Sequence, residues 1–345
     1  MKRKITIRDV AKHAGVSPAS VSYAVNGKKK VSAETKQKIL KAIQELNYRP
    51  DFTAVSLSSK KSKLIGIMKI WNEDSLLPVL QSNPYYNEFI SGIESVTRTH
   101  GYDILLTGIE NAEESEEWVH KRNLDGLVLM GSFPSVVQNL AETADIPIVL
   151  VDYYEGVSGN FHTMNIADEE GGYLATKHLL ELGHTCIAMA LTNISKSPVD
   201  HQRFLGYKRA LKEFGVPFRE SLVFDSVSNF FQSSLEAGND ILRSKQNITA
   251  VFSTSDTLSL GIMRTLSSNG MKIPEDFSIV GFDDLSVSQY LTPSLSTVRQ
   301  DIFKKGQLTA TMIFKAMEQG NSEPLKETLP VELIIRESSV ARQTK

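Results

Sequence analysis

Apolar residues along most of the chain gather in short runs, and helical patterns separate one run from the next. Such short runs are typical of strands that are buried on both faces. Alternating strands and helices predict an α/β fold in which parallel sheets carry helices on both sides. The predicted strands are Leu64–Met68, Asp103–Thr107, Gly126–Met130, Ile148–Asp152, Cys186–Leu191, Ala250–Ser253 and Ser278–Phe282. The predicted helices between them include Tyr86–His100, Ala175–Leu182, Phe204–Phe214 and Leu258–Asn269.

The first fifty residues carry a different pattern, which predicts three short helices. Thr6 is a candidate N-cap for the first helix, and Gly15 ends it because glycine tolerates a left-handed turn. Ser17 and Pro18 begin the second helix, and Ser32 begins the third. The apolar stripes are Ile7, Val10, Ala11 and Ala14, then Val21, Ala24 and Val25, then Ile39, Ala42, Ile43 and Leu46.

The spacing of Ala11, Gly15 and Val21 lets the first two helices cross closely, which is the geometry of a helix-turn-helix. A three-helix bundle with no role in DNA binding is the alternative. The outer face of the second helix favours DNA, because it is short, polar and almost free of acids. The residues expected to contact DNA on this face are Ser17, Ser20, Ser22, Tyr23 and Asn26, together with the N-cap residues Thr6 and Ser32 and the phosphate-binding Lys28.

Charge is divided unevenly between the two parts of the chain. Residues 1–63 hold 15 Lys and Arg against four acids, whereas the whole chain of 345 residues holds 38 basic and 40 acidic side chains. A basic module joined to an acidic body suggests that the module meets a polyanion. A solvated lysine-rich tail is the other interpretation of the charge alone, and the helical pattern within the segment argues against it.

Composition excludes several classes of protein. No apolar run approaches the roughly 18 residues of a membrane helix, and no secretory leader precedes Thr6, so we expect a cytoplasmic protein without membrane contact. The single cysteine, Cys186, excludes an internal disulfide and a thiolate zinc cluster. Phosphate-loop, zincin and hydrolase-elbow motifs are all missing. We therefore expect no enzyme, no cofactor and no metal.

Polar residues follow the predicted strands of the body at their carboxyl ends, where ligands of parallel sheets bind. Asp152, Ser255 and Asp283 stand at three such ends, and Arg203 is predicted to open a helix. Aspartates with an arginine suit a ligand rich in hydroxyl groups. Each residue taken alone is more commonly a cap or a turn former, and a glycosidase pair of Asp152 and Asp283 remains a distant alternative.

The segment from Thr6 to Ser17, followed by Val21-Ser22, Asn26-Gly27, Val31-Ser32 and Leu46–Pro50, resembles the lactose-repressor (LacI/GalR) family of bacterial transcription regulators. The resemblance continues to the C-terminus. It implies a helix-turn-helix headpiece over residues 1–49, a hinge helix and linker over 50–63, and a two-lobed effector domain like the periplasmic binding proteins over 64–345. The implied N-lobe covers 64–162 and 296–324, and the implied C-lobe covers 163–293 and 327–340, with crossings near 152–166, 291–297 and 323–327.

For DNA binding, the resemblance implies that Pro18 and Ala19 set the operator sequence and that Tyr23 reads it one turn later. In the hinge, Ala54 and Leu57 match residues that pack hinge against hinge and wedge into the minor groove. Asp51 and Val55 depart from the family pattern, so weaker minor-groove binding is expected. A Leu57 that simply packs on the body is the alternative.

For the effector, the resemblance implies that Asp152, Arg203, Asp283 and Gln300 hold hydroxyl groups. Further matches are Tyr85 and Tyr86 at the mouth of the interlobe cleft, Phe230 as a less secure stacking ring, and Ser255 in place of a common asparagine. The long segment 71–82 forms either a lid or a surface loop. A carbohydrate is favoured over a purine, because Asp and Arg suit hydroxyl groups.

Together these features predict a dimeric repressor of carbohydrate genes that binds a palindromic operator in double-stranded DNA. No leucine heptads that could form a tetramer follow Glu337. Two other readings stay open: a global catabolite regulator that answers to a phosphorylated protein partner, and a sugar-binding transport protein. The second would need a leader peptide and would lack the first fifty residues.

Overall fold

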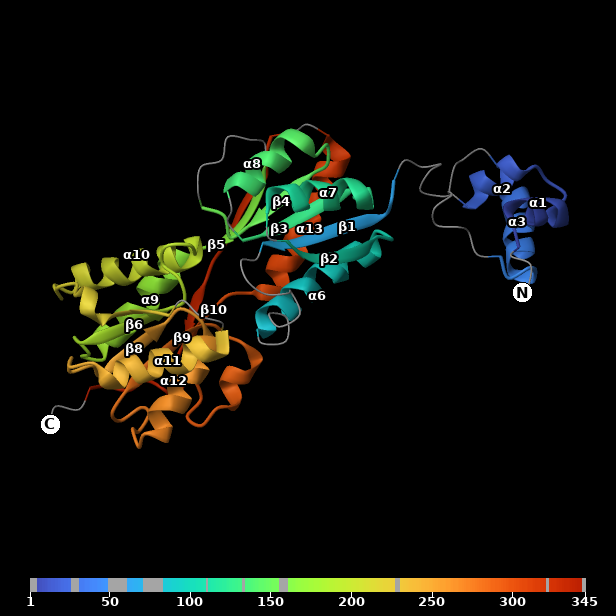
Figure 1. The fold of residues 1–345 in the computed structure, drawn as a ribbon. Helices are drawn as coiled ribbons and strands as arrows, with labels where there is room; N and C mark the ends of the chain where they lie inside the picture. The colour runs from blue at the N-terminus through green and yellow to red at the C-terminus, as the bar shows by residue number, and fades with distance from the viewer. Residues whose placement is uncertain are drawn as a thin grey trace. The chain divides into compact units, whose positions relative to one another are not determined.

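The computed structural model describes residues 5–25, 31–48, 61–70, 83–109, 111–131, 134–154, 161–226, 230–320 and 323–342 (Figure 1). The chain divides into a smaller unit, Met1–Lys63 with Asn123–Asp125, and a larger unit, Leu64–Arg122 with Gly126–Lys345. We call them the headpiece and the body. Each unit has its own hydrophobic core. No helix in the described part of the chain has both the length and the hydrophobicity that a membrane span requires.

The headpiece contains the three helices that the sequence predicts: α1 (Ile7–Ala14), α2 (Pro18–Val25) and α3 (Ala33–Glu45). Thr6 and Asp9 form a capping box at the start of α1, and Gly15 ends the helix with φ of 66°. Val10, Val21 and Ile39, one from each helix, are fully buried against one another's helices. This small apolar core fixes α2 on α1 and α3.

The N-lobe of the body is built on a six-stranded sheet in the order β11-β5-β4-β3-β1-β2, and every pairing is parallel. Its strands are β1 (Leu64–Ile70), β2 (Asp103–Ile109), β3 (Gly126–Met130), β4 (Ile148–Val151), β5 (His162–Ile166) and β11 (Lys326–Leu329). Its helices are α6 (Pro84–Thr99), α7 (Ala112–Arg122), α8 (Pro134–Thr143) and α13 (Ile302–Gln319).

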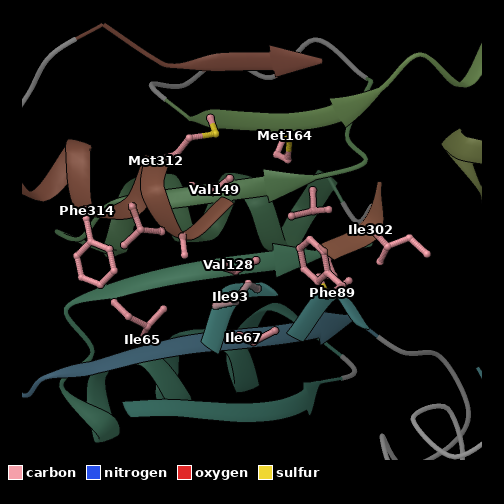
Figure 2. Close-up of a cluster of buried hydrophobic side chains, with 14 of the residues drawn as sticks. Ile65, Ile67, Phe89, Ile93, Val128, Val149, Met164, Ile302, Met312 and Phe314 are labelled. Carbon is pink, nitrogen blue, oxygen red and sulfur yellow. The ribbon is translucent and has the colours of Figure 1, made fainter. Parts of the chain in front are cut away.

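One face of this sheet packs against α6 and α13 (Figure 2). Ile67 and Val128 of the strands share one hydrophobic core with Phe89 and Ile93 of α6 and with Ile313 of α13, and all five are fully buried. Alternate strand residues such as Leu127 and Leu150 are buried as well. The sheet is therefore covered on both faces, as its apolar strands predict.

The C-lobe repeats the arrangement with a second six-stranded sheet in the order β12-β10-β9-β8-β6-β7. Its strands are β6 (Ile187–Leu191), β7 (Val223–Asp225), β8 (Ala250–Ser253), β9 (Ser278–Asp283), β10 (Ser296–Arg299) and the antiparallel β12 (Glu332–Ile334). Around them lie α9 (Asp168–Glu181), α10 (Pro198–Glu213), α11 (Phe230–Arg243) and α12 (Asp256–Ser268), with short 3-10 helices η1 (Glu220–Leu222) and η2 (Ser286–Tyr290). One core packs the sheet on α9 and α10, and another packs it on α11 and α12.

The three crossings between the lobes lie further along the chain than the sequence suggested. β5 pairs with β4, so the chain leaves the N-lobe only at Ala167, not before residue 163. β10 pairs with β9, so residues 296–299 belong to the C-lobe and the return comes at Gln300–Asp301. β11 pairs with β5, so the last crossing is at Pro330–Val331. Before each crossing, the chain adds one more short strand to the sheet of the lobe that it is about to leave: β5 and β11 in the N-lobe and β10 in the C-lobe.

Each lobe brings two helices together at glycines. A Cβ on Gly306 of α13 would lie 2.2 Å from the Phe89 carbonyl oxygen of α6, and a Cβ on Gly92 would lie equally close to Phe303. In the C-lobe, a Cβ on Gly206 of α10 would lie 2.0 Å from the Glu169 carbonyl oxygen of α9. Only glycine permits such an approach of two backbones. These two crossings set the position of the side chains beside them.

Candidate functional site

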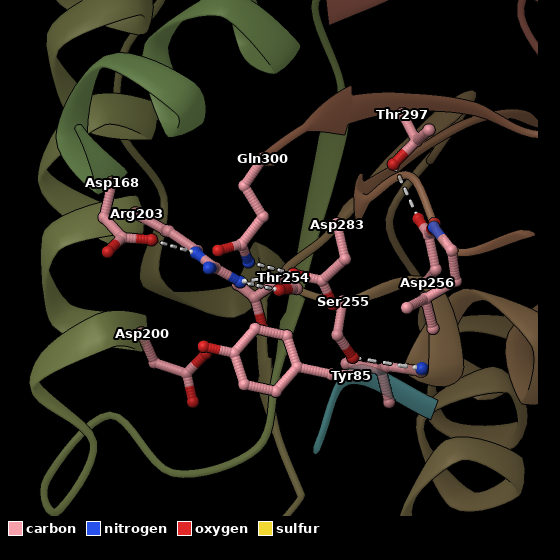
Figure 3. A network of polar contacts seen from close by, with 12 residues as sticks. Tyr85, Asp168, Asp200, Arg203, Thr254, Ser255, Asp256, Asp283, Thr297 and Gln300 are labelled. Atoms are coloured by element: carbon pink, nitrogen blue, oxygen red, sulfur yellow. Dashed lines mark hydrogen bonds and ion pairs between the residues drawn. The ribbon is translucent and has the colours of Figure 1, made fainter. Parts of the chain in front are cut away.

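Asp283 is the centre of the polar cluster on the C-lobe side (Figure 3). It is the last residue of β9, where the backbone takes φ of 111°. Its Oδ1 accepts a hydrogen bond of 2.6 Å from Nε2 of Gln300. Burial raises the pKa of Asp283 to about 7, although the Arg203 guanidinium acts in the opposite direction. The carboxyl group therefore exchanges its proton near neutral pH.

Gln300 carries a buried acceptor. Its side chain is 4% exposed, and its Oε1 finds no hydrogen-bond partner among the residues that the structure describes. The amide nitrogen donates to Asp283, which fixes the oxygen on the other side of the group. A buried carbonyl oxygen without a donor costs free energy, so this atom fits a ligand that donates a hydrogen bond.

Arg203 lies within α10, five residues after its start, and does not open a helix as the sequence suggested. Its Nε donates to Asp168 at 2.6 Å, and its Nη1 donates to the Thr254 carbonyl oxygen. Nη1 also lies 3.9 Å from Oδ1 of Asp283, and the guanidinium stacks 3.5 Å from the centre of the Phe282 ring. Burial opposes the charge, but the carboxylates of Asp168 and Asp283 hold the pKa of Arg203 above its usual range.

Asp168 joins this arginine to the other lobe. It is the first residue of α9, and burial raises its pKa although Arg203 acts against the rise. Tyr154, which follows β4 of the N-lobe, donates its hydroxyl hydrogen to Oδ2 of Asp168 and also lies 3.1 Å from the Ile166 carbonyl oxygen. Burial raises the pKa of Tyr154, and the charge of Asp168 adds to the rise. A hydrogen-bonded chain thus runs from the N-lobe through Asp168 to Arg203.

The N-lobe side of the site holds Tyr85, Asp152 and Lys305. Asp152 follows β4 with φ of 58°, and its Oδ1 lies 2.6 Å from Nζ of Lys305. The Tyr85 hydroxyl donates to Oδ2 of Asp152 at 3.3 Å and accepts from Lys305 at 3.0 Å. The Asp152 side chain is 20% exposed, whereas that of Lys305 is 1% exposed. A buried ammonium therefore holds a carboxylate that reaches solvent.

Groups from the two lobes share one electrostatic environment. Burial raises the pKa of Tyr85, and the charge of Asp152 in its own lobe adds to the rise. Asp283 and Asp168 of the C-lobe raise it further. The charges of these carboxylates therefore reach a single hydroxyl group from both lobes. The structure thus brings together five predicted residues: Tyr85, Asp152, Arg203, Asp283 and Gln300.

The remaining predicted effector residues are placed less directly. Ser255 is the N-cap of α12, and its Oγ accepts from the Leu258 amide at 3.1 Å. Tyr86 is half-buried and packs edge-on against Tyr85, with 5.3 Å between ring centres. The side chain of Phe230 and the whole segment 71–82 lie outside the described residues. The contribution of these groups to ligand binding stays a prediction.

Lys305 and Asp256 are among the residues whose roles the sequence did not predict. Lys305 falls on the apolar stripe of α13, between Ile302 and Thr309, and a lysine on a buried helix face is a signal that could have found it. Asp256 follows the predicted strand Ala250–Ser253, and the sequence assigned it no role. It is fully buried and accepts from the Leu285 amide, Ser288 and Thr297, so it holds η2 and β10 against α12.

In the headpiece, the predicted DNA-binding face lies along α2. Ser17, Pro18 and Ala19 are exposed, and Ser20, Ser22 and Tyr23 are partly exposed. Ser17 caps the helix by accepting from the Ser20 amide at 3.1 Å, and Thr6 and Ser32 cap α1 and α3 in the same way. Asn26, Lys28, Ala54 and Leu57 lie outside the described residues. Within the described part of the chain, no group of His, Cys, Asp and Glu is arranged to hold a metal ion.

Comparison with known proteins gives two family matches. Residues 6–51 match the bacterial regulatory proteins of the lacI family, and residues 176–339 match the periplasmic binding protein-like domain. The HTH-type transcriptional repressor PurR of Pasteurella multocida is 33% identical over 98% of this chain and 99% of its own. The ribose operon repressor of Halalkalibacterium halodurans is 32% identical over 97% of each chain. The structure of the lac repressor dimer bound to operator and the anti-inducer ONPF covers 98% of this chain and 100% of its own, with a TM-score of 0.84 and 25% identity.

Proposed function

The chain belongs to the lacI family of bacterial regulatory proteins, and we propose that, as a DNA-binding transcription repressor, it answers to an uncharged sugar held between its two lobes. Its relatives are transcriptional repressors and not enzymes. The observation that carries the choice of ligand is the buried Oε1 of Gln300, which accepts no hydrogen bond from the described residues. A sugar hydroxyl is a donor of the required kind.

The charges of the site favour a neutral ligand over a phosphate or a carboxylate. Both buried cations already hold carboxylates: Lys305 pairs with Asp152, and Arg203 pairs with Asp168 and Asp283. An anionic ligand would have to displace one of these carboxylates at a large electrostatic cost. Hydroxyl groups instead donate to the free lone pairs of the aspartates and of Gln300. These acceptors, on the aspartates and on Gln300, also favour a sugar over a purine.

Operator binding is proposed for the exposed start of α2. Pro18 and Ala19 offer apolar contact, for instance to a thymine methyl group, and Tyr23 offers a hydroxyl to a base edge. The structure of the related lac repressor was determined as a dimer on its operator. By analogy, two copies of this chain bind a palindromic operator in the bacterial cytoplasm. The effector acts by linkage, because it populates whichever lobe arrangement binds it better.

A panel of ligands tests the proposal. Thermal unfolding of the full-length protein is measured with neutral sugars including ribose, galactosides and cellobiose, with the corresponding sugar phosphates and with nucleobases. A neutral sugar should raise the Tm, and Gln300→Leu should abolish that rise. Gln307→Leu is the matched control, since the Gln307 side chain bonds to Ser95 of α6 and not to a residue of the polar cluster.

The outcomes separate the alternatives. A shift with a sugar phosphate or a nucleobase alone would contradict the neutral-sugar proposal. Operator binding that changes only with a phosphorylated protein would favour the global-regulator alternative. Turnover of an oligosaccharide would revive the glycosidase pair of Asp152 and Asp283. The operator itself can be found by selection from random DNA, and substitution of Ala19 should then change the preferred sequence.

A further inference from the structure

We propose that Lys305 is a specificity-determining residue that acts through Asp152: its ammonium neutralises and positions this carboxylate, so that the N-lobe side of the site selects uncharged sugars and rejects amino sugars. The inference rests on the proposed function, because it concerns the same ligand site. It adds a residue to that site and defines which charge the ligand can carry.

Lys305 is buried because it lies on the face of α13 that packs into the N-lobe. Ile302, Gly306 and Thr309 share the buried stripe of α13, and Gly306 brings α13 into backbone contact with α6. That contact places the start of α6, and with it Tyr85, beside the lysine. A lysine in this environment is stable only with a partner, and its stem is held where its ammonium meets Asp152 at 2.6 Å.

Asp152 and Tyr85 together fix the orientation of the Lys305 ammonium group. Nζ donates to Asp152 and to the Tyr85 hydroxyl, and it lies 5.5 Å from the centre of the Tyr85 ring. Tyr85 in turn donates to the second oxygen of Asp152. Three groups thus form a closed triangle in which the lysine is buried and the carboxylate alone is partly exposed. The ligand meets the carboxylate, and the lysine determines its orientation and its net charge.

The charge of this triangle has a direct consequence for selectivity. With Lys305 present, Asp152 accepts hydrogen bonds from hydroxyl groups but offers no net negative charge. A ligand ammonium placed there would be repelled by the lysine and attracted by the aspartate to similar degrees, while it would lose its hydration. Without Lys305, the carboxylate would attract a cationic ligand. Lys305→Met should therefore move the preference toward amino sugars.

A first experiment needs no ligand. Asp152→Asn leaves the buried ammonium without a carboxylate and should lower the Tm by about 5 °C or more. Adding Lys305→Met to that variant removes the unpaired charge and should restore much of the loss. Lys304→Met, which changes the exposed neighbour on the same helix, should restore nothing. A double variant with Lys305→Met that is no more stable than Asp152→Asn would overturn the ion pair and the proposal with it.

The second experiment measures selectivity. Affinities are measured by calorimetry for the neutral sugar found with the panel and for its monoamino derivatives at each ring position. Lys305→Met should raise the ratio of amino-sugar to neutral-sugar affinity by about tenfold for at least one derivative. Lys304→Met should leave the ratio unchanged. In the double variant Asp152→Asn/Lys305→Met, the ratio should be lower than in Lys305→Met alone, because the carboxylate that attracts the amino group is gone.

The two failures can be told apart. If no neutral sugar binds the unmodified protein, the proposed function is wrong, and the ligand-free stability cycle still decides whether Lys305 serves Asp152. If a neutral sugar binds and the ratio is the same in Lys305→Met and Lys304→Met, the role of Lys305 in specificity is refuted while the sugar site stands.

Discussion

In both lobes of the body a buried cation lies beside an aspartate at the end of a strand, but the cation differs between the lobes. Their sheets share one strand order, and β4 and β9 hold equivalent places in it. An aspartate with positive φ stands at the end of each strand: Asp152 follows β4, and Asp283 is the last residue of β9. In each lobe a buried cation pairs with carboxylates, and it projects from a helix that meets its neighbour at a pair of glycines.

The difference lies in how many partners each cation has. The planar guanidinium of Arg203 contacts Asp168, Asp283, the Thr254 carbonyl oxygen and the Phe282 ring. Among the residues that the structure describes, the ammonium of Lys305 contacts Asp152 and Tyr85. An arginine fork holds several groups in one geometry, whereas a lysine acts as a point charge. The C-lobe cation is therefore held by more groups, whereas the described ion pairing of the N-lobe cation is with Asp152 alone.

The largest effect is expected from Arg203→Met. Two buried carboxylates lose their cation, which should cost about 3 to 5 kcal/mol of stability and abolish the response to sugar. Thermal or denaturant unfolding measures the first, and the ligand panel measures the second. Lys305→Met should cost less, because Asp152 reaches solvent. Equal losses in the two variants would contradict the contrast between the lobes.

The second largest effect is expected from substitution of the glycines at the helix crossings. Gly206→Ala places a methyl group 2.0 Å from a backbone oxygen of α9 and forces the two helices apart, at a cost of about 1 to 3 kcal/mol or more. Gly306→Ala should do the same to α13 and α6. Each change should weaken sugar binding, since it moves Arg203 or Lys305. Leu205→Ala, at an exposed site on α10, provides the control for lost helix packing.

The pH dependence of stability tests the raised pKa of Asp283 on the C-lobe side. Burial raises the pKa of Asp283 to about 7, so the folded protein keeps a proton that the unfolded chain loses near pH 4. This residue should thus lower the stability as the pH rises from about 4 to 7 and add no further change above 7. Asp283→Asn should remove that part of the slope in unfolding measurements. An unchanged slope would show that another group is responsible.

The smallest effect is expected from Arg209→Met. Arg209 also joins α10 to α9, through Glu169 at 2.8 Å and through Glu170, but all three side chains are more than 40% exposed. An exposed pair of this kind should contribute less than about 1 kcal/mol. Both arginines bridge α10 and α9, so a larger loss of stability in Arg203→Met than in Arg209→Met can be assigned to burial. A large loss in Arg209→Met would remove that distinction.

Much of the fold followed from local patterns. Apolar runs such as Gly126–Met130 and Ala250–Ser253 match β3 and β8 residue for residue, and the capping residues of the headpiece gave the starts of α1, α2 and α3. The positions of the crossings could not be found this way. β5 alternates buried and half-buried residues, and the edge strands β11 and β12 are short and hold no buried residue. Their membership depends on pairing with strands that are distant in sequence.

The candidate site was predicted in the same uneven manner. Asp152 and Asp283 could be found because they follow recognisable strands. Arg203 was selected as a side chain that suits hydroxyl groups, although the start of α10 at Pro198 escaped the helical pattern around Phe204. Gln300 came from the family resemblance alone. Lys305 and Tyr154 were missed, since their partners lie 153 and 14 residues away and only the folded chain brings them together.

The late position of α13 in the chain has a consequence for synthesis. α6 needs α13 to cover Phe89 and Ile93, yet about two hundred residues separate the two helices, and the intervening C-lobe is translated first. The N-lobe therefore cannot close its core until the ribosome has released nearly the whole polypeptide. A nascent chain stopped before Ile302 should be cut by proteases in α6, while its α9 and α10 resist them.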